Sequence, residues 1–277
     1  MPEANLLTVA GLTKTFPLRR TLGARMRREP AGSHLAVDDV SFELGRGEIL
    51  GIAGQSGSGK TTVARCLIRL VEPDSGQIMM DGENVRVANE PKLRLIRRDL
   101  QMIFQDPYTS LNPRMSIGDA ICEAGRVHNR PGSEDPVKFA TMQLERVGLP
   151  ASSASRRPSE LSGGQRQRVA IARSLAVGPR ALIADEAVSA LDVSVQAQLL
   201  NLFLDLRDEL GLSILFISHQ LAVLAEVADR MAIMHQGRIV EIGAAADVLS
   251  RPKEDYTRRL LAANPSPDPS QRLEAAI

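Results

Sequence analysis

The sequence predicts an α/β fold, in which a mainly parallel sheet is covered by helices and a helical lobe is inserted. Three observations predict it. Short apolar runs alternate with helical patterns, above all after residue 180, which is typical of a parallel sheet. The stretch from 116 to 176 has several helical patterns and no convincing strand. The chain has 277 residues, 43% of them hydrophobic, which is enough for a substantial core in one domain or in two lobes.

The first elements surround a glycine-rich loop. Gly47–Ala53 is a short apolar run bounded by glycines, so we expect a buried strand there. Thr61–Leu70 has apolar residues at helical spacing, which predicts a helix directly after the loop. Two more strand-like segments follow, at Gln77–Met80 and Leu100–Phe104. The order strand, glycine-rich loop, helix is the context that a phosphate-binding loop requires.

The middle of the chain is helical. Helical patterns cover Ile117–Arg126, Pro136–Val147 and Gln165–Ala176. Pro131-Gly132 and the proline-bounded stretch 150–158 separate them. We therefore expect a helical lobe inserted into the α/β lobe.

The last third returns to alternating strands and helices. Apolar strand-like runs lie at Ala181–Ala184, Ser213–Ile217 and Met231–Met234. Helical patterns lie between them, at Val195–Leu210 and Leu221–Ala228. This alternation is what predicts a mainly parallel sheet.

Composition excludes several function classes. Aromatic residues make up 3% of the chain, tryptophan is absent and the net charge is +1, so a nucleic-acid surface is not expected. The two cysteines are far apart, which disfavours a disulfide or zinc framework and fits a reducing compartment. The N-terminus does not resemble a signal peptide, and no apolar stretch is long enough to span a bilayer. If the protein acts at a membrane, we expect it to act from the cytosolic side through partners.

Two segments are expected to be irregular. A basic stretch between Phe16 and Leu35 is interpreted as a solvated loop, with contact to anionic lipid or to a partner as the alternative. The C-terminal tail is rich in proline and is expected to be irregular. The residues concerned are Arg19, Arg20, Arg25, Arg27 and Arg28 in the first segment, and Pro265, Pro267 and Pro269 in the second.

The loop Gly54–Thr61 matches the full eight-position phosphate-loop pattern. Its glycines let successive N–H groups point at phosphate oxygens, and the following helix adds its positive end. Lys60 can reach the β- and γ-phosphates of ATP, and the Thr61 hydroxyl can ligate Mg²⁺. An ordinary glycine-rich turn is disfavoured because the loop lies between a strand and a helix. The predicted ATP-binding residues here are Gly54, Gln55, Ser56, Gly57, Ser58, Gly59, Lys60, Thr61 and Thr62.

Two acids end the apolar run that begins at Ala181. A carboxylate in that position is costly unless a cation faces it. Asp185 is well placed to hold Mg²⁺ through water, and Glu186 to polarise an attacking water. The alternative is that the two acids only mark the end of a strand. The presence of a phosphate loop in the same chain makes this alternative less favoured.

Leu161–Gln165 reads as a second phosphate-binding surface. It combines small residues with a helix N-terminus expected near Gln165, the same physical arrangement as the phosphate loop. A chain with two such surfaces on different parts is expected to complete its ATP site with another copy.

Taken in order, these motifs resemble those of the ATP-binding subunits of ABC transporters, over almost the whole chain. The resemblance implies a RecA-like P-loop NTPase lobe with a mixed sheet, an inserted α-helical lobe and a small antiparallel β part. It implies four segments: the first portion of the ATPase lobe at 1–105, the helical lobe with the signature motif at 106–178, the second portion at 179–250, and a C-terminal extension at 251–277.

The same resemblance implies roles for single residues. Ser162, Gly163, Gly164 and Gln165 look like the family signature, which faces ATP bound by the opposite subunit. Gln105 resembles the glutamine that senses Mg²⁺ and the attacking water, Asp192 lies in the loop that crosses between subunits, and His219 resembles the switch histidine at the γ-phosphate. Phe16 resembles the aromatic that stacks on adenine, with a core phenylalanine as the alternative. The implied catalytic residues are Glu186, His219 and Gln105, and the implied metal ligands are Thr61, Gln105 and Asp185.

Two departures from the family pattern do not remove a catalytic group. Ala187-Val188 replaces the common Pro-Thr, and Gln220 follows His219 where aspartate is commoner. We therefore expect an active ATPase.

Three stretches resemble the oligopeptide/dipeptide/nickel importer branch of the family. They are Phe104–Met115, Ala187–Gln196 and Asp255–Leu261. The resemblance implies a peripheral subunit at the cytoplasmic face of the inner or plasma membrane. Its partners would be a second ATP-binding subunit, identical or paralogous, two transmembrane permease subunits and a solute-binding protein. No cysteine follows Cys122, so no iron–sulfur cluster is expected.

Three alternatives stay open. A non-transport member of the superfamily, in DNA repair or translation, would usually have two cassettes or a long coiled coil. A stand-alone phosphotransferase would leave Leu161–Gln165 unexplained. An exporter ATPase is commonly fused to membrane spans. The solute carried cannot be read from a subunit that does not touch it.

Overall fold

The computed structural model describes residues 5–17, 32–106 and 111–263. Three groups of predictions lie outside these ranges. They concern the arginines Arg19, Arg20, Arg25, Arg27 and Arg28, the part 107–110 of the Phe104–Met115 stretch, and the prolines Pro265, Pro267 and Pro269.

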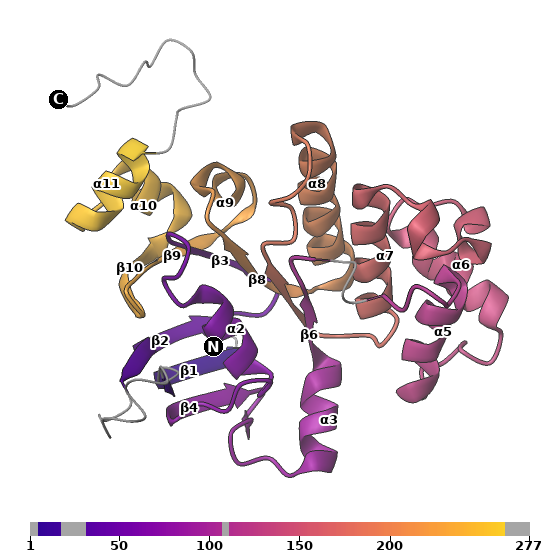
Figure 1. Cartoon of the computed structure of the whole chain (residues 1–277), viewed down its shortest axis with the longest axis horizontal. Coiled ribbons are helices and arrows are strands. Elements are labelled where there is room, and N and C mark those ends of the chain that lie inside the picture. Colours follow the sequence, from indigo (N-terminus) through magenta and orange to yellow (C-terminus); the bar gives the residue numbers. More distant parts are fainter. Residues whose placement is uncertain (1–4, 18–31, 107–110, 264–277) are drawn as a thin grey trace, which may run out of the picture.

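A six-stranded mixed sheet forms the centre of the molecule, with strand order β10-β9-β3-β8-β7-β6 (Figure 1). The five strands from β9 to β6 are parallel, and β10 pairs antiparallel with β9. All five strands predicted for this sheet are present, and β10 was not predicted. The strands are β3 Ile49–Ala53, β6 Leu100–Ile103, β7 Ala181–Asp185, β8 Ser213–Ser218, β9 Arg230–His235 and β10 Arg238–Ala244.

A second, four-stranded antiparallel sheet lies beside the first in Figure 1. Its order is β2-β1-β4-β5, from β2 Ser33–Leu44, β1 Leu7–Pro17, β4 Ser75–Met80 and β5 Glu83–Asn84. Local sequence predicted only β4. Register shifts after Val9, Leu12 and Lys14 interrupt β1, so its burial does not alternate strictly and the period-2 signal is weak.

Helices cover both faces of the central sheet. α2 Lys60–Leu67 follows β3, and α8 Val193–Leu210 and α9 Leu221–Val227 flank β8. Along β8 the side chains alternate between two buried clusters, with Ile214 and Phe216 in one and Leu215 and Ile217 in the other. Because both faces of β8 are buried, its sequence is a nearly continuous apolar run.

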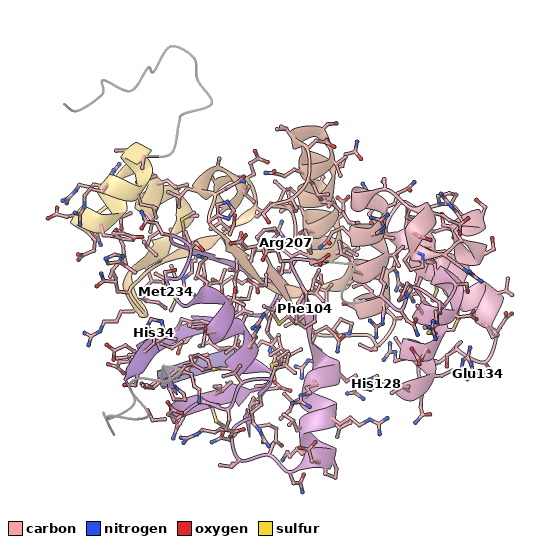
Figure 2. The ribbon with its side chains drawn as sticks, viewed as in Figure 1. His34, Phe104, His128, Glu134, Arg207 and Met234 are labelled. Atoms are coloured by element: carbon pink, nitrogen blue, oxygen red, sulfur yellow. The ribbon has the colours of Figure 1, made fainter. Side chains whose placement is uncertain are left out.

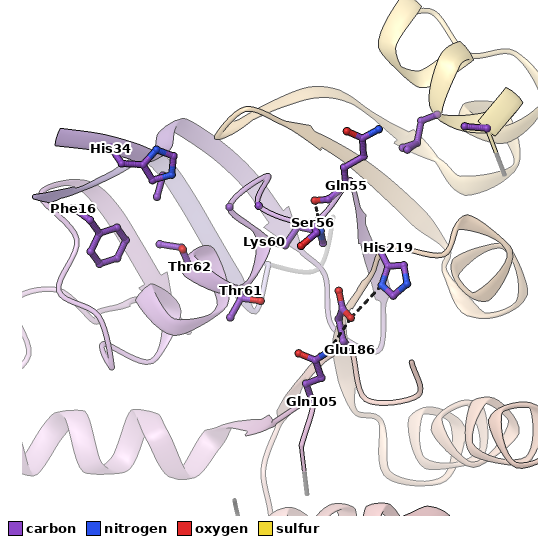
Figure 3. A pocket seen from close by; sticks show the side chains of 15 residues that line it. Phe16, His34, Gln55, Ser56, Lys60, Thr61, Thr62, Gln105, Glu186 and His219 are labelled. Carbon is purple, nitrogen blue, oxygen red and sulfur yellow. Dashed lines mark hydrogen bonds and ion pairs between the residues drawn. The ribbon is translucent and has the colours of Figure 1, made fainter. Parts of the chain in front are cut away.

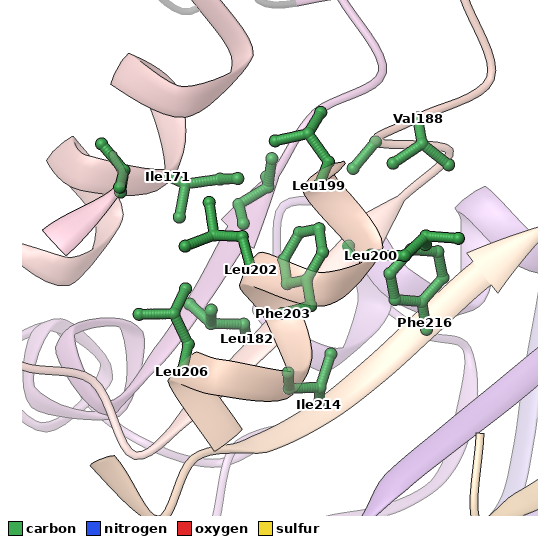
Figure 4. Packing of buried hydrophobic residues seen from close by; sticks show 14 of the residues in the cluster. Ile171, Leu182, Val188, Leu199, Leu200, Leu202, Phe203, Leu206, Ile214 and Phe216 are labelled. Carbon is green, nitrogen blue, oxygen red and sulfur yellow. The ribbon is translucent and has the colours of Figure 1, made fainter. Parts of the chain in front are cut away.

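One of these clusters centres on two phenylalanines. Phe203 of α8 and Phe216 of β8 meet edge to face, with ring centroids 5.2 Å apart and planes at 84° (Figure 4). Both rings are fully buried. This contact fixes α8 on the sheet and therefore fixes the loop between β7 and α8, which carries Glu186 and Asp192.

The predicted helices of the middle region are present. α5 Ile117–Val127, α6 Pro136–Arg146 and α7 Gly163–Leu175 gather on the side away from the antiparallel sheet (Figure 1). Two short 3-10 turns, Ala151–Ser155 and Pro158–Glu160, lie between α6 and α7. No strand occurs between residues 116 and 176, all of which the structure describes. The division of the chain at 105, 178 and 250 stays a prediction.

One helix start was placed too late by the sequence. α7 begins at Gly163, not near Gln165. The Ser162 side chain accepts the Gln165 N–H, and the Gln165 side chain accepts the Ser162 N–H, so the two residues form a capping box. Gln165 is the third residue of α7. The apolar repeat from which the sequence predicts this helix begins after the first helical residues.

Three α-helices within the described ranges were not predicted. α3 Glu90–Asp99 begins after Asn89, whose side chain caps it, and buries only Leu93 and Ile96 among many charges. α10 Ala245–Ser250 and α11 Asp255–Ala263 follow β10. Within the described ranges, no helix combines the length and hydropathy needed to cross a bilayer.

Candidate nucleotide site

A cavity of about 660 Å³ lies where the carboxyl ends of β3, β7 and β8 meet. Such an edge of a parallel sheet is the usual place for a ligand site in α/β proteins. The sequence-predicted residues that line it come from five separate parts of the chain (Figure 3). They are Phe16, Gln55, Ser56, Gly57, Gly59, Lys60, Thr61, Thr62, Gln105, Glu186 and His219.

The phosphate loop joins β3 to α2. Gly59 is the residue before the helix, with φ +105°, and a Cβ there would overlap the Ala36 carbonyl oxygen. A Cβ on Gly54 would meet the Met234 carbonyl oxygen in the same way. Met234 and His34 lie in the same region of the molecule, far from Glu134 of the helical lobe (Figure 2). The loop therefore packs against neighbouring backbone, which only glycine permits.

Lys60 rests on its own loop. Its Nζ donates to the carbonyl oxygens of Gly54 at 2.7 Å and Gln55 at 2.9 Å, and lies 3.4 Å from the Ser58 hydroxyl. Burial lowers the pKa of the Lys60 ammonium, and the nearby carboxylates of Glu186 and Asp185 oppose this shift. Gly54 and Ser58 thus support the loop and Lys60 without lining the cavity themselves.

Thr61 and Asp185 bring two oxygen atoms together that are suited to bind a metal ion. The Thr61 hydroxyl donates to Asp185 Oδ1 at 3.1 Å, and Asp185 is 4% exposed at the end of β7. Burial raises the pKa of the Asp185 carboxyl, while the Thr61 hydrogen bond opposes this. A buried carboxylate beside a hydroxyl fits Mg²⁺, which takes hard oxygen donors and completes its shell with water and phosphate. A nearby cation would favour the charged carboxylate that burial disfavours.

Glu186 is held from two sides. Gln105 Nε2 donates to Glu186 Oε2 at 3.3 Å, and His219 Nδ1 lies 3.1 Å from the same oxygen (Figure 3). The backbone at Glu186 has φ +51°, a conformation that is uncommon outside glycine, and its N–H donates to Ile217 of β8. The strained turn directs the carboxylate out of the sheet edge and into the cavity.

The outer wall of the cavity comes from the antiparallel sheet. Phe16 of β1 and His34 of β2 are cross-strand partners, so both side chains lie on one face (Figure 3). Phe16 is 36% exposed and lines the cavity, which contradicts the alternative of a core phenylalanine. Sequence reasoning missed His34, Ala36, and Leu260 and Ala263 of α11. Only the pairing of distant segments brings them here, so no local signal marks them.

The signature residues lie elsewhere. None of Ser162, Gly163, Gly164, Gln165 or Asp192 lines the cavity. The signature forms the first turn of α7, where a Cβ on Gly164 would overlap Val195 of α8. Asp192 caps α8, since its Oδ1 accepts the Val195 N–H at 2.9 Å. The start of α7 therefore packs against the start of α8, with Gly164 buried between them and Ser162, Gly163 and Asp192 exposed.

Residues 37–189 match the family model described as ABC transporter. The chain belongs to this family. It is 49% identical over 96% of its length to the glutathione import ATP-binding protein GsiA of Shigella flexneri, and 48% identical over 98% to GsiA of Pectobacterium atrosepticum. The chain spans 42% and 43% of the length of these relatives. A solved dimeric ATP-binding cassette, MJ0796, bound to ADP and phosphate in a post-hydrolysis state, matches with TM-score 0.75 and 26% identity over 86% of this chain and 98% of that one.

The predicted ABC ATPase cassette is thus confirmed as family and as fold. The mixed sheet, the antiparallel sheet and the helical region all belong to it. The roles of single residues and the Mg²⁺ site stay predictions.

Gly59→Ala is expected to weaken ATP binding by this cassette roughly tenfold or more, because the new Cβ would combine a strained φ with backbone overlap. Gly82→Ala is the matched control. Gly82 also has a strained φ, +80°, but a Cβ there meets nothing within 4 Å and the residue does not line the cavity, so ATP binding should be unchanged. Titration calorimetry with ATP measures both. Equal losses in the two variants would contradict the packing argument.

Proposed function

We propose that this chain hydrolyses ATP and that the hydrolysis energises import of a peptide-type solute through an ABC transporter. One observation carries the ATPase proposal. The Glu186 carboxylate, fixed by Gln105 and His219, lines the same cavity as the phosphate loop. The importer proposal is supported by relatives named for import of glutathione, which is a tripeptide.

ATP binding is proposed to rearrange the phosphate loop. Lys60 would leave the carbonyl oxygens of Gly54 and Gln55 and donate to phosphate oxygens instead, since those carry more charge. Thr61, Asp185 and Gln105 would hold Mg²⁺, which when bound neutralises charge on the phosphates. Phe16 would stack on the adenine base, and Thr62 would donate to a neighbouring phosphate.

Glu186 is proposed to accept a proton from the attacking water. A general base must be oriented as well as basic, and the contacts of Gln105 and His219 to Oε2 restrict how the carboxylate can turn. His219 is 43% exposed and can swing toward the γ-phosphate without leaving a buried site. These three residues are the proposed catalytic set.

A second ATP-binding subunit is proposed to complete the site. Ser162–Gln165 lies outside the cavity at a helix N-terminus, an arrangement suited to binding phosphate held by another subunit. The dimeric ADP- and phosphate-bound cassette with the same fold supports this arrangement. ATP drives closure only if it binds the closed dimer more tightly than the open one. Asp192, at the start of α8, would lie at the same interface.

The remaining partners follow from the importer proposal. Two transmembrane permease subunits and a solute-binding protein would complete the complex, with this chain peripheral at the cytoplasmic face of the membrane. The four segments with boundaries after 105, 178 and 250 are proposed on the family pattern. A non-transport ABC ATPase and a stand-alone phosphotransferase are less favoured. The first lacks support from the importer relatives, and the second gives the α7 surface no role.

The importer proposal is tested by sequencing the genes that neighbour this chain's own gene and coexpressing this chain with those that encode polytopic membrane proteins. We expect the chain to copurify with two polytopic membrane proteins and to support uptake of radiolabelled glutathione or dipeptide by proteoliposomes. Lys60→Ala should keep the complex assembled and abolish uptake, because the loop loses its cation. Failure to associate with any permease would contradict the transport proposal. Assembly with uptake unaffected by Lys60→Ala would contradict the role of this ATP site.

A further inference from the structure

The segment that carries Phe16 is weakly supported by its own sheet. Pairing between β1 and β4 ends at Thr13 opposite Ser75. Beyond that point β1 has a strand partner on one side only, β2, and its register to β2 shifts on both sides of Lys14. A ring that is to stack on a base needs a fixed orientation, which this end of β1 does not obtain from strand pairing alone.

Asp74 makes hydrogen bonds to the part of β1 that has no strand partner on this side. It immediately precedes β4, and its Oδ2 accepts the Thr15 N–H at 2.7 Å. Its Oδ1 accepts from Lys14 Nζ at 2.8 Å, and its own N–H donates to the Thr13 carbonyl at 2.9 Å. Asp74 therefore forms hydrogen bonds with each of the three residues that directly precede Phe16.

Lys14, which Asp74 holds by a hydrogen bond, also contacts the Phe16 ring. Lys14 Nζ lies 5.5 Å from the centroid of the Phe16 ring, within the range of a cation–π contact. Lys14 does not line the cavity, whereas Phe16 does. The hydrogen bond from Lys14 lowers the pKa of the Asp74 carboxyl, so the carboxylate is charged at neutral pH and keeps the ammonium in place.

We propose that Asp74 is a positioning residue for nucleobase binding, which acts through Lys14 and the Thr15 backbone to orient the Phe16 ring. The inference rests on the proposed ATP site and extends it, because it assigns base affinity to a residue outside the cavity. The carboxylate side of this ion pair is open to solvent, with Asp74 45% and Lys14 15% exposed, and such a pair adds little to global stability, so its removal should act locally. The proposal requires that Asp74 affect ligands with a base and not ligands without one.

The test compares the affinity of the purified protein for ATP and for inorganic tripolyphosphate, both with Mg²⁺, by titration calorimetry. Asp74→Ala should weaken ATP binding about three- to tenfold, the scale of an aromatic or cation–π contact. Binding of tripolyphosphate should not change. Asp81→Ala is the matched control. Asp81 follows β4 as Asp74 precedes it and pairs with Arg46 and Arg180, so its loss should leave both affinities unchanged.

Two further variants make the test specific. In a Phe16→Ala background, Asp74→Ala should cost no more ATP affinity, since both changes remove the same contact. Asp74→Asn keeps an acceptor for the Thr15 N–H without the charge and should retain part of the affinity. Equal losses for ATP and tripolyphosphate, or additive losses with Phe16→Ala, would overturn the proposal.

Failure of the underlying ATP site gives a different result. In that case Lys60→Ala would leave the affinities for ATP and for tripolyphosphate unchanged. If Lys60→Ala weakens both ligands while Asp74→Ala weakens neither, the ATP site stands and the positioning role of Asp74 falls.

Discussion

Replacing Glu186 by glutamine is expected to lower the rate of ATP hydrolysis by roughly 10²- to 10⁴-fold and to leave ATP binding intact. The amide has nearly the same shape and can keep one contact to Gln105 or His219, but it cannot accept the proton of an attacking water. Removing one negative charge near the phosphates should not weaken ATP binding. Phosphate release by the assembled complex, together with nucleotide affinity, measures both expectations.

Glu48→Gln is the matched control for this variant. Glu48 precedes β3 at the end of the sheet away from the cavity, and its side chain is 15% exposed, close to the 17% of Glu186. It pairs with Arg230 at 3.0 Å and should leave hydrolysis near the wild-type rate. If the wild type and Glu186→Gln hydrolyse ATP at the same slow rate, the Glu186 carboxylate is not the catalytic base.

Ser162→Arg is expected to abolish closure of the ATP-bound dimer, and with it nearly all hydrolysis, while ATP still binds to the single subunit. The arginine places bulk and charge at the first turn of α7, where phosphate from the opposite subunit must pack. Because Ser162 does not line the cavity, binding of ATP in the same chain should be preserved. Crosslinking between engineered cysteines across the dimer measures closure.

Ser162→Ala separates the bulk from the lost helix cap. It removes the hydroxyl that accepts the Gln165 N–H, at a cost of about 1 kcal/mol in stability, without filling space. Its dimer should still close. Closure that persists in Ser162→Arg, or that is lost equally in Ser162→Ala, would contradict the proposal that this surface receives phosphate.

Contiguous motifs made much of the fold and site predictable. The phosphate loop follows β3 and the pair Asp185-Glu186 lies at the end of β7, and both strands are buried on both faces, so an apolar run marks where each motif begins. The helices α5 and α6 were predicted because their apolar faces repeat at helical spacing over more than two turns. In these cases the local pattern and the tertiary environment agree.

The remainder depends on contacts between distant segments. His34 and Ala36 reach the cavity only because β2 pairs with β1 in one particular register. Leu260 and Ala263 reach it because the backbone before α11 is fixed by Glu241, whose carboxylate accepts the N–H groups of Lys253 and Glu254. α3 was missed because a helix that buries two side chains carries little apolar signal.

The pairing of Pro17 with Ser33 at the end of the β1–β2 hairpin has an evolutionary consequence. It fixes the two ends of the connection 18–32 beside Phe16 and His34, whatever conformation that connection adopts. Closing a longer connection between fixed ends costs only about 0.6 kcal/mol for each doubling of its length. Insertions and deletions can therefore accumulate there without moving the cavity wall that Phe16 and His34 form. The length of this connection is thus free to vary while the cavity stays the same.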